Sequence, residues 1–256
     1  MKRTTTVFLA GLLSACLATH QADAALIAHY DFGDGNLFDD ETGNGYTLSQ
    51  STVNGDGITL NGDGFSANFD NSAGSNYLFT NDFDEAAGSS YTVSMWFRSS
   101  NMSQPVQTGM FSSIGGNQWQ LEIATDSDIA VRRSVNPGEL NSDVLPSNDT
   151  WTHYAVVVDG LNSSLYVSED DGSLTLTDTD AATALSLVDF RIGVNRAANL
   201  TYDGDYASIA IYDTALTFDE LNVLYVSGPI EIVPEPSSTA LLGLGLSSLM
   251  LRRKRS

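Results

Sequence analysis

Tyr91-Thr-Val-Ser-Met-Trp-Phe-Arg98 is the stretch of this 256-residue chain that decides the fold. Apolar and polar side chains alternate over most of its length, which is the period-two pattern of a β-strand with one face in a core. The side chains expected on that buried face are those of Tyr91, Val93, Met95 and Phe97.

A second stretch, Trp151-Thr-His-Tyr-Ala-Val-Val-Val-Asp-Gly160, has a different pattern of apolar residues. Its apolar run at 155–158 is continuous, which is typical of a strand in the centre of a sheet. Asp159-Gly160 then supplies the chemistry of a tight turn before the next apolar residues. Together the two stretches predict long central strands of a β-sheet protein.

Shorter β-rich segments repeat along the middle of the chain, separated by clusters of Gly, Asn, Asp and Ser. This rhythm is typical of an all-β sandwich or barrel. The length is consistent with one such domain, because all-β sandwiches run to about 200–250 residues. The predicted strands are 26–31, 58–60, 66–69, 77–80, 91–98, 109–114, 118–124, 129–133, 152–158, 164–167, 189–194 and 206–212.

One helix is expected, and it closes the domain. Thr217 and Glu220 have the spacing of a capping box, in which each side chain accepts a hydrogen bond from the other residue's amide. Apolar residues follow at helical spacing, beginning with Leu221 and Leu224. Gly228-Pro229 then ends the helix.

Charge is unevenly distributed along the chain. The formal net charge is −21, from 32 acidic and 11 basic residues. The span 25–233 contains 30 of the acidic residues but five arginines and no lysine, so its net charge is −25. A protein that binds nucleic acid needs clustered Lys and Arg to neutralise the phosphates. The composition therefore excludes a nucleic-acid partner.

Residues 1–24 have the pattern of a secretory signal peptide. Basic residues precede a short apolar run, and Ala22-Asp23-Ala24 is a small-x-small site, so we expect cleavage directly after Ala24. Leu13-Ser-Ala-Cys16 resembles a bacterial lipobox, and acylation of Cys16 is the alternative. Cys16 is the only cysteine, so cleavage after Ala24 leaves a mature chain that has no disulfide.

The C-terminus combines Val233-Pro-Glu-Pro-Ser-Ser238, an apolar run at 239–251 and the basic cluster Arg252-Arg-Lys-Arg255. The apolar run is shorter than the roughly 20 residues that span a bilayer, and the basic cluster favours a cytoplasmic end. These three parts, in this order, resemble the PEP-CTERM sorting signal of bacterial exported proteins. The motif itself is Pro234, Glu235 and Pro236.

The resemblance to this signal implies that residues 234–256 are recognised by an exosortase, a membrane protease. It also implies that the chain meets the membrane only transiently, through 239–251. The implied location is the cell surface or extracellular matrix of a Gram-negative-type bacterium, of a kind that makes exopolysaccharide. An ordinary tail anchor is the alternative interpretation.

The segments between the two ends resemble, in their order, the laminin-G-like, concanavalin-A-like jelly-roll domain. The matching segments are 26–32, 39–45, 67–70, 76–78, 91–98, 151–160 and 204–216. The resemblance implies an antiparallel jelly-roll β-sandwich with one short C-terminal helix over residues 25–228. Residues 229–233 are then a linker to the sorting signal.

Relatives of this fold include glucanases and lectins, so we searched for paired carboxylates. Glucanases of this fold carry a Glu-x-Asp-x-Glu type of motif, since two carboxylates must flank the glycosidic bond. None of the eight Glu residues has that spacing, and Glu122-Ile-Ala-Thr-Asp126 comes nearest. His153, beside Trp151, is interpreted as a packing residue. We therefore expect a non-catalytic module, with a glycoside hydrolase as the weaker alternative.

Calcium is the expected cofactor, because an exported domain rich in Asp and Asn offers the oxygen ligands that this ion prefers. In the resembled family the metal often lies between the loop after the first strand and the last strand. This implies Asp40 and Asn44 as ligands, with Gly43 in the tight turn. Asp205 is the candidate on the last strand, two residues before the family's usual acid position, where Ala207 stands. Solvated loop acids are the alternative.

A sugar site needs an exposed aromatic ring beside amides and acids, because Tyr and Trp combine an apolar body with a polar tip. The predicted ligand-binding rings are Trp119, Tyr202 and Tyr206, which have such neighbours in the sequence. The favoured function is an exported module that binds extracellular polysaccharide. A structural or adhesive matrix protein, without a defined sugar site, is the alternative.

Overall fold

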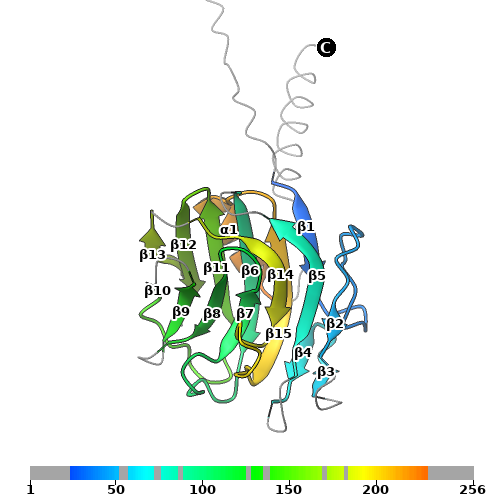
Figure 1. The fold of residues 1–256 in the computed structure, drawn as a ribbon. Coiled ribbons are helices and arrows are strands. Elements are labelled where there is room, and N and C mark those ends of the chain that lie inside the picture. Colours follow the sequence, from blue (N-terminus) through cyan, green and yellow to red (C-terminus); the bar gives the residue numbers. More distant parts are fainter. Residues whose placement is uncertain are drawn as a thin grey trace, which may run out of the picture.

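The computed structural model describes residues 24–51, 57–71, 76–85, 89–124, 128–134, 139–168, 172–181 and 184–229. Residues 1–23 of the predicted signal peptide and the sorting signal from Pro234 onward lie outside the described residues. The described chain forms 15 strands and one helix (Figure 1). The elements are β1 (Leu26–Tyr30), β2 (Ser49–Gln50), β3 (Ile58–Leu60), β4 (Ser66–Phe69), β5 (Leu78–Glu85), β6 (Tyr91–Arg98), β7 (Gly109–Ser113), β8 (Trp119–Ile123), β9 (Ile129–Arg133), β10 (Glu139–Asn141), β11 (Thr152–Asp159), β12 (Asn162–Ser168), β13 (Leu174–Asp180), β14 (Leu187–Ile192), β15 (Gly204–Tyr212) and α1 (Phe218–Ser227).

The strands form two antiparallel sheets that face each other, as a jelly-roll sandwich requires (Figure 1). The first sheet has the order β13-β12-β11-β6-β15-β4-β3, and β1 also pairs with β15. The second sheet has the order β10-β9-β8-β7-β14-β5-β2. Neighbours such as β6 and β15 are far apart in sequence, so the fold depends on long-range pairing.

The main core lies between the two sheets, and β6 contributes to it as its alternation predicts. Tyr91, Val93, Met95 and Phe97 are all buried in this core. Phe97 stacks on Tyr154 of β11, with 4.8 Å between the ring centroids. Burial of such large rings is the main favourable term in a fold that has no described disulfide to support it.

The other face of β6 is buried as well, whereas the alternation of its side chains by itself predicts one buried face. A second apolar cluster lies on the outer side of the first sheet, where Leu221 and Leu224 of α1 pack against Ala155 and Val157 of β11. Trp96 of β6 stacks on Tyr225 of the helix, with 5.7 Å between the ring centroids. The helix therefore seals this face of the sandwich.

The predicted helix is confirmed at both ends. Thr217 is the N-cap, and its side chain and that of Glu220 form the reciprocal capping box. Gly228 follows the last helical residue with a φ of 79°, a left-handed value that glycine adopts without strain. Leu26 packs against the same cluster as the helix, so the described chain begins and ends on one side of the domain. No helix among the described residues is long and apolar enough to cross a membrane.

Candidate functional site

The outer face of the second sheet carries the polar side chains from which we build the candidate site. In β8, the side chains of Trp119, Leu121 and Ile123 belong to the core. Because successive side chains of a strand point to opposite faces, Gln120 and Glu122 lie on the outer face. The sequence of β8 therefore places an amide and a carboxylate directly behind the packed core.

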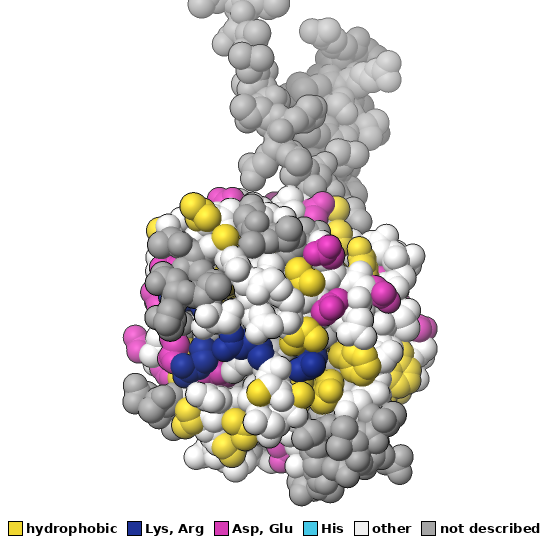
Figure 2. Space-filling model, in the orientation of Figure 1, with side chains coloured by type: hydrophobic (Ala, Val, Ile, Leu, Met, Phe, Trp, Pro, Cys, Tyr) yellow, Lys and Arg dark blue, Asp and Glu magenta, His cyan; other side chains and the backbone are white. Residues whose placement is uncertain are grey.

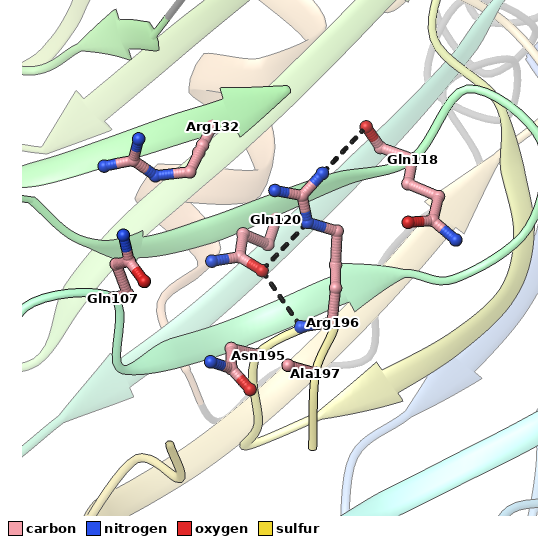
Figure 3. A pocket seen from close by; sticks show the side chains of 7 residues that line it. All are labelled: Gln107, Gln118, Gln120, Arg132, Asn195, Arg196 and Ala197. Atoms are coloured by element: carbon pink, nitrogen blue, oxygen red, sulfur yellow. Dashed lines mark hydrogen bonds between the residues drawn. The ribbon is translucent and has the colours of Figure 1, made fainter. Parts of the chain in front are cut away.

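A hollow of about 460 Å³ opens on this face (Figure 3). Its walls come from β8, from β9, from the segment between β14 and β15, and from the segment that precedes β7. The lining residues are Gln107, Gln118, Gln120, Arg132, Asn195, Arg196 and Ala197. Amides and guanidinium groups thus dominate the lining, and both are strong hydrogen-bond donors.

Arg196 is held in the hollow by two bonds to one oxygen of Gln120. Its backbone amide and its Nε donate to Gln120 Oε1, at 2.9 and 3.1 Å (Figure 3). Its Nη1 also lies 3.5 Å from the carbonyl oxygen of Gln118. The Gln120 side chain is almost fully buried, so this anchor is fixed by packing.

The carboxylates near the hollow are tied to Arg132. Glu122 is buried, and it accepts hydrogen bonds from Arg132 and from the Gln120 amide. Burial raises the pKa of Glu122, and the bonds from Arg132 and Gln120 oppose that rise. The second carboxylate, that of Glu139 in β10, lies 2.5 Å from Arg132 Nη2. One guanidinium thus bridges both acids.

The segment after β14 positions Arg196 through its own hydrogen bonds. The Asn195 side chain accepts from the amides of Asn199 and Leu200, at 3.1 and 3.4 Å. Gly109 of β7 lies directly against this segment, and its amide donates to the carbonyl of Leu200. A side chain at Gly109 would overlap with the backbone at Asn195, so only glycine allows this close approach.

Two aromatic rings continue the site along the same face. Phe79 lies opposite Arg191 in the pairing of β5 with β14, and the Arg191 guanidinium lies 5.5 Å from the Tyr77 ring centroid. Arg191 Nη1 also donates to the carbonyl of Arg196, at 2.8 Å. Figure 2 shows basic side chains in a row across the middle of this face, beside a group of hydrophobic side chains.

The predicted ligand-binding rings are not on the surface, and that prediction is wrong. Trp119, Tyr202 and Tyr206 each have 0% exposure. Trp119 stacks on Phe111 and donates to the Ser186 carbonyl, while the Tyr206 hydroxyl donates to the Met110 carbonyl. Their polar atoms are thus satisfied inside the core. The half-buried rings of the outer face are instead Tyr77 and Phe79.

The predicted metal ligands are split between two places. The Asp40 carboxylate is engaged within its own loop and the adjoining strand. It accepts hydrogen bonds from the backbone amides of His29, Thr42 and Tyr46. Asn44 donates to the Ile27 carbonyl, and Gly43 takes the left-handed turn with a φ of 74°. This loop lies at β1, which pairs with the later half of β15.

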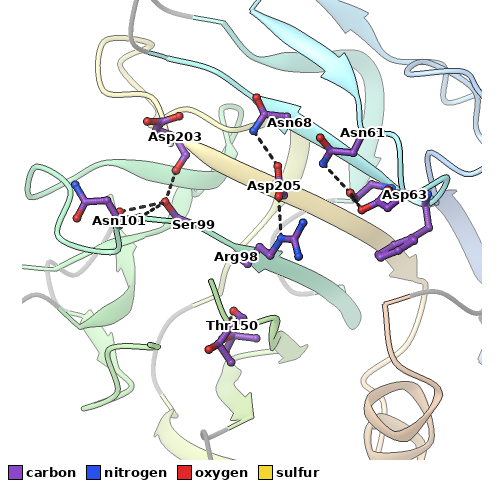
Figure 4. A network of polar contacts seen from close by, with 12 residues as sticks. Asn61, Asp63, Asn68, Arg98, Ser99, Asn101, Thr150, Asp203 and Asp205 are labelled. Atoms are coloured by element: carbon purple, nitrogen blue, oxygen red, sulfur yellow. Dashed lines mark hydrogen bonds and ion pairs between the residues drawn. The ribbon is translucent and has the colours of Figure 1, made fainter. Parts of the chain in front are cut away.

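Asp205 lies near the start of β15 and is engaged elsewhere (Figure 4). Its carboxylate pairs with Arg98 at 2.8 Å and accepts from Asn68, also at 2.8 Å. The residue of β15 that pairs with His29, beside Asp40, is Ala210. Ala210 lies five steps along the strand from Asp205, about 16 Å at the rise of a strand. The three residues therefore do not form one site, and calcium binding stays a prediction without Asp205 as a ligand.

One acidic cluster is present among the described residues. Carboxylate oxygens of Asp31, Asp34 and Glu41 lie within 4.8 Å of one another. Burial and the surrounding acids raise the pKa of Glu41. Exposed acidic groups of this kind are common on protein surfaces, so the cluster assigns no metal.

His153 is a packing residue, as predicted from the sequence. It is fully buried between Trp96 and Tyr225, and its Nε2 lies 2.7 Å from the Ser94 hydroxyl. Burial lowers the pKa of His153 to about 3, so the ring is neutral near pH 7. The helix covers this Ser–His pair, and a substrate has no access to it.

The comparison with protein families identifies this architecture. Residues 71–222 match the model of the concanavalin A-like lectin/glucanases superfamily. The chain belongs to this superfamily. Residues 233–255 match the PEP-CTERM protein-sorting motif, which confirms the resemblance found at the C-terminus. No curated protein matches the chain significantly.

Solved structures show the same superfamily fold. Domain 4 of AbnA, a GH43 extracellular arabinanase from Geobacillus stearothermophilus, was solved in complex with arabinotriose. It is 21% identical with a TM-score of 0.62, and the match covers 79% of this chain and 99% of that domain. The ligand-binding domain of botulinum neurotoxin serotype D, in complex with N-acetylneuraminic acid, is 14% identical with a TM-score of 0.58. That match covers 79% of this chain and 50% of the toxin chain, so only half of the toxin domain corresponds.

The hollow described here was missed in the sequence, although a signal was present. Gln118, Gln120 and Glu122 alternate with the core residues of β8, which marks them as outer-face positions. Arg191 lies in β14, and Arg196 lies in the irregular segment after this strand. Their spacing in the sequence therefore does not predict the hydrogen bond from Arg191 to the Arg196 carbonyl. The bonds that hold Arg196 run to Gln120, 76 residues earlier in the chain, and such a long-range contact is not visible in the sequence.

Proposed function

We propose that this chain is an exported, non-catalytic module that binds polysaccharide outside the cell through the hollow on the second sheet. The observation that carries the proposal is the hollow itself, which is lined by amide and guanidinium donors and extended by two half-buried rings. Sugar hydroxyls need hydrogen-bond partners of this kind, and sugar rings stack on apolar surfaces such as aromatic rings.

Two comparisons support a saccharide as the ligand. The AbnA domain is in complex with arabinotriose, and the toxin domain is in complex with N-acetylneuraminic acid. Both share the fold with this chain at low identity, so they support the class of ligand rather than its identity. The PEP-CTERM signal indicates export and a cell-surface or extracellular location. An exported protein at such a location can meet extracellular polysaccharide.

Processing by an exosortase completes the proposal. The enzyme would act at the sorting signal that contains Pro234, Glu235 and Pro236, after cleavage of the signal peptide behind Ala24. Mass spectrometry of the exported protein is then expected to find Ala25 at the N-terminus and no intact residues 234–256. A diacylglyceryl group on Cys16 would contradict this order of processing.

The geometry of the hollow does not favour glycoside hydrolysis. Hydrolysis needs two carboxylates that reach the glycosidic bond from opposite sides. Glu122 is fully buried, and Arg132 holds both Glu122 and Glu139. One guanidinium therefore engages both carboxylates, and neither is free to reach a glycosidic bond from the opposite side of the other.

The test is binding of the full-length chain to a panel of neutral and acidic polysaccharides, measured by affinity electrophoresis and calorimetry. The double variant Tyr77→Ala/Phe79→Ala is expected to weaken binding about tenfold, as for the truncation of an interface anchor. Phe218→Ala is the matched control, because this ring is exposed on α1, far from the second sheet in the fold. Absence of binding to every polysaccharide would contradict the proposal.

The high acidity supports a second candidate, a structural or adhesive matrix protein. A net charge of −25 on residues 25–233 favours solubility and bridging through cations. Deletion of the gene is then expected to change cell aggregation or matrix composition, while the variants of Tyr77 and Phe79 leave both unchanged. Unchanged aggregation and matrix after the deletion would contradict this candidate.

A further inference from the structure

We infer that the hollow is specific for a sugar that bears a carboxylate, such as a uronic acid unit within a polysaccharide. This inference rests on the proposed function and names the class of ligand. Basic side chains are rare in the span 25–233, and most of them lie on the outer face of the second sheet.

Three of the five arginines in the span 25–233 lie on the outer face of the second sheet. They are Arg132, Arg191 and Arg196, and they occur in a span whose net charge is −25. Figure 2 shows basic side chains in a row across this face. A polyanion is repelled by most of such a surface, so a single basic row gives both an attractive site and selectivity.

The ion pairs of the described residues separate these arginines into two kinds. Arg98 pairs with Asp205, Arg133 with Asp180, and Arg132 with Glu122 and Glu139. Arg191 and Arg196 make no ion pair with any described residue, since they donate to an amide oxygen and to backbone carbonyls. Their positive charge is therefore not neutralised by a carboxylate of the chain.

The guanidinium of Arg196 is arranged in advance for a ligand. Gln120 fixes its Nε and backbone amide, and its Nη2 has no hydrogen-bond partner among the described residues. A guanidinium binds a carboxylate through two parallel hydrogen bonds, which demands a fixed plane. Because the side chain is already held, little further conformational entropy is lost on binding.

The acidic groups that face the hollow do not cancel this charge. Glu122 has no exposed surface, and both of its oxygens accept hydrogen bonds within the chain. Glu139 is paired with Arg132, at 2.5 Å. Beside the hollow, three guanidinium groups, those of Arg132, Arg191 and Arg196, therefore lie near two carboxylates, so the charge there is positive although the molecule is strongly negative. Asp82, Asp84 and Asp189 belong to the same sheet but do not line the hollow.

The face is also long enough for a polymer. The strands run in the order β9, β8, β7, β14, β5, so four steps separate Arg132 from Phe79. At the usual spacing of neighbouring strands, this is about 19 Å. A chain of sugars that crosses the strands would place one carboxylate at Arg196 and a neighbouring ring on Tyr77 and Phe79.

The experiment compares matched polymers on the full-length chain. Polygalacturonate, alginate and hyaluronate are each tested by calorimetry beside the same polymer after reduction of its carboxyl groups, and dextran sulfate is the sulfate-bearing arm. We expect at least one carboxylated polymer to bind about tenfold more tightly than its reduced form, with weaker binding at high salt. Arg196→Gln should remove this preference.

Arg98→Gln is the control variant, because it removes the same charge from the first sheet. It should keep the preference for the carboxylated polymer. If Arg196→Gln lowers the melting temperature, Arg191→Gln serves as the second variant, since it leaves the bonds to Gln120 in place.

The outcomes separate the inference from the proposed function. Equal binding of the carboxylated and reduced polymers, or tighter binding of dextran sulfate, would overturn the inference and leave polysaccharide binding standing. Loss of the preference in Arg98→Gln as well would also overturn it, because total charge would then explain the result. Binding to none of the polymers, acidic or neutral, would overturn the proposed function itself.

Discussion

Trp119 shows how a single ring decides between a core and a surface role. Its neighbours in sequence are polar, but its indole stacks on Phe111 and its Nε1 bonds to the Ser186 carbonyl at 3.1 Å. We expect Trp119→Ala to lower the free energy of unfolding by about 3–5 kcal/mol, as for large-to-small changes in a core. Urea denaturation of the purified chain measures this loss.

The control for Trp119→Ala is Tyr77→Ala, because the Tyr77 side chain is half-buried on the outer face of the second sheet. This variant should change the urea midpoint little, while it weakens polysaccharide binding. A stable Trp119→Ala protein with lost binding would show instead that the indole contacts the ligand, and the assignment of Trp119 to the core would be wrong.

His153 connects burial to the pH dependence of stability. Its pKa is about 3 in the folded chain, against about 6.5 when it is unfolded. Between these two values the unfolded chain binds a proton that the folded chain does not. Stability is therefore lost as the pH falls from about 6.5 towards 3, by about 1.4 kcal/mol for each pH unit.

His153→Gln is the variant that isolates this effect, because glutamine does not titrate. The free energy of unfolding, measured from pH 7 to pH 4, should fall less steeply in His153→Gln than in the unchanged chain. Carboxylates titrate in the same range, but they are common to both proteins and cancel in the difference. Parallel curves would show that the pKa of His153 is the same in the folded and the unfolded chain, and the assignment of a lowered pKa would be wrong.

For single side chains, the sequence predicts which face of a strand they occupy better than it predicts which residues they contact. The alternation in β6 correctly predicted which residues face the core, and the same rule applied to β8 would have placed Trp119 inside. What the sequence could not predict is which loops meet. Arg196 reaches Gln120 only because the segment after β14 folds back over β8, 76 residues earlier in the chain.

At the scale of the elements, the contact between β7 and the segment after β14 shapes the hollow. Gly109 allows this contact, and a Cβ there would overlap with Val194 and Asn195. We expect Gly109→Ala to cost about 1–3 kcal/mol of stability through overpacking. Because Arg196 directly follows Asn195, the same change should weaken polysaccharide binding.

Gly62→Ala is the matched control for this variant, since an added Cβ there meets nothing within 4 Å. It should leave both the urea midpoint and the binding unchanged. Full binding by Gly109→Ala would mean that the segment moves without disturbing Arg196, and the hollow would then owe its shape to other contacts.

The elements also differ in how well the sequence indicated them. The central strands β6 and β11 were predicted within one residue at their ends, because their apolar content is high. Strands β10 and β13 were missed, and both lie at the edges of their sheets. Edge strands often carry polar and charged residues, and the Thr-Asp-Thr-Asp end of β13 does so. Such a strand has too little alternation of apolar residues to be recognised alone.

At the scale of the whole molecule, the two ends of the domain and the hollow have separate places. The described chain begins and ends at the cluster beside α1, next to the first sheet. The residues that line the hollow belong to the second sheet and its adjoining segments. A chain that is attached at its C-terminus would therefore leave the outer face of the second sheet open to the surroundings. This arrangement suits a module that is held at the surface and meets a polymer there.

Labelling of an introduced cysteine tests this arrangement on cells. The proposed cleavage after Ala24 would remove Cys16, so that Ala197→Cys would give a mature chain with one thiol, on the exposed rim of the hollow. A maleimide that does not cross membranes should label it on intact cells or in the culture medium. Ala155→Cys is the control, because this position has no exposed surface and its thiol should react only after unfolding. Added acidic polysaccharide should slow the labelling at position 197, since a bound polymer covers the rim. Labelling that requires lysis of the cells would place the domain inside and contradict its surface location.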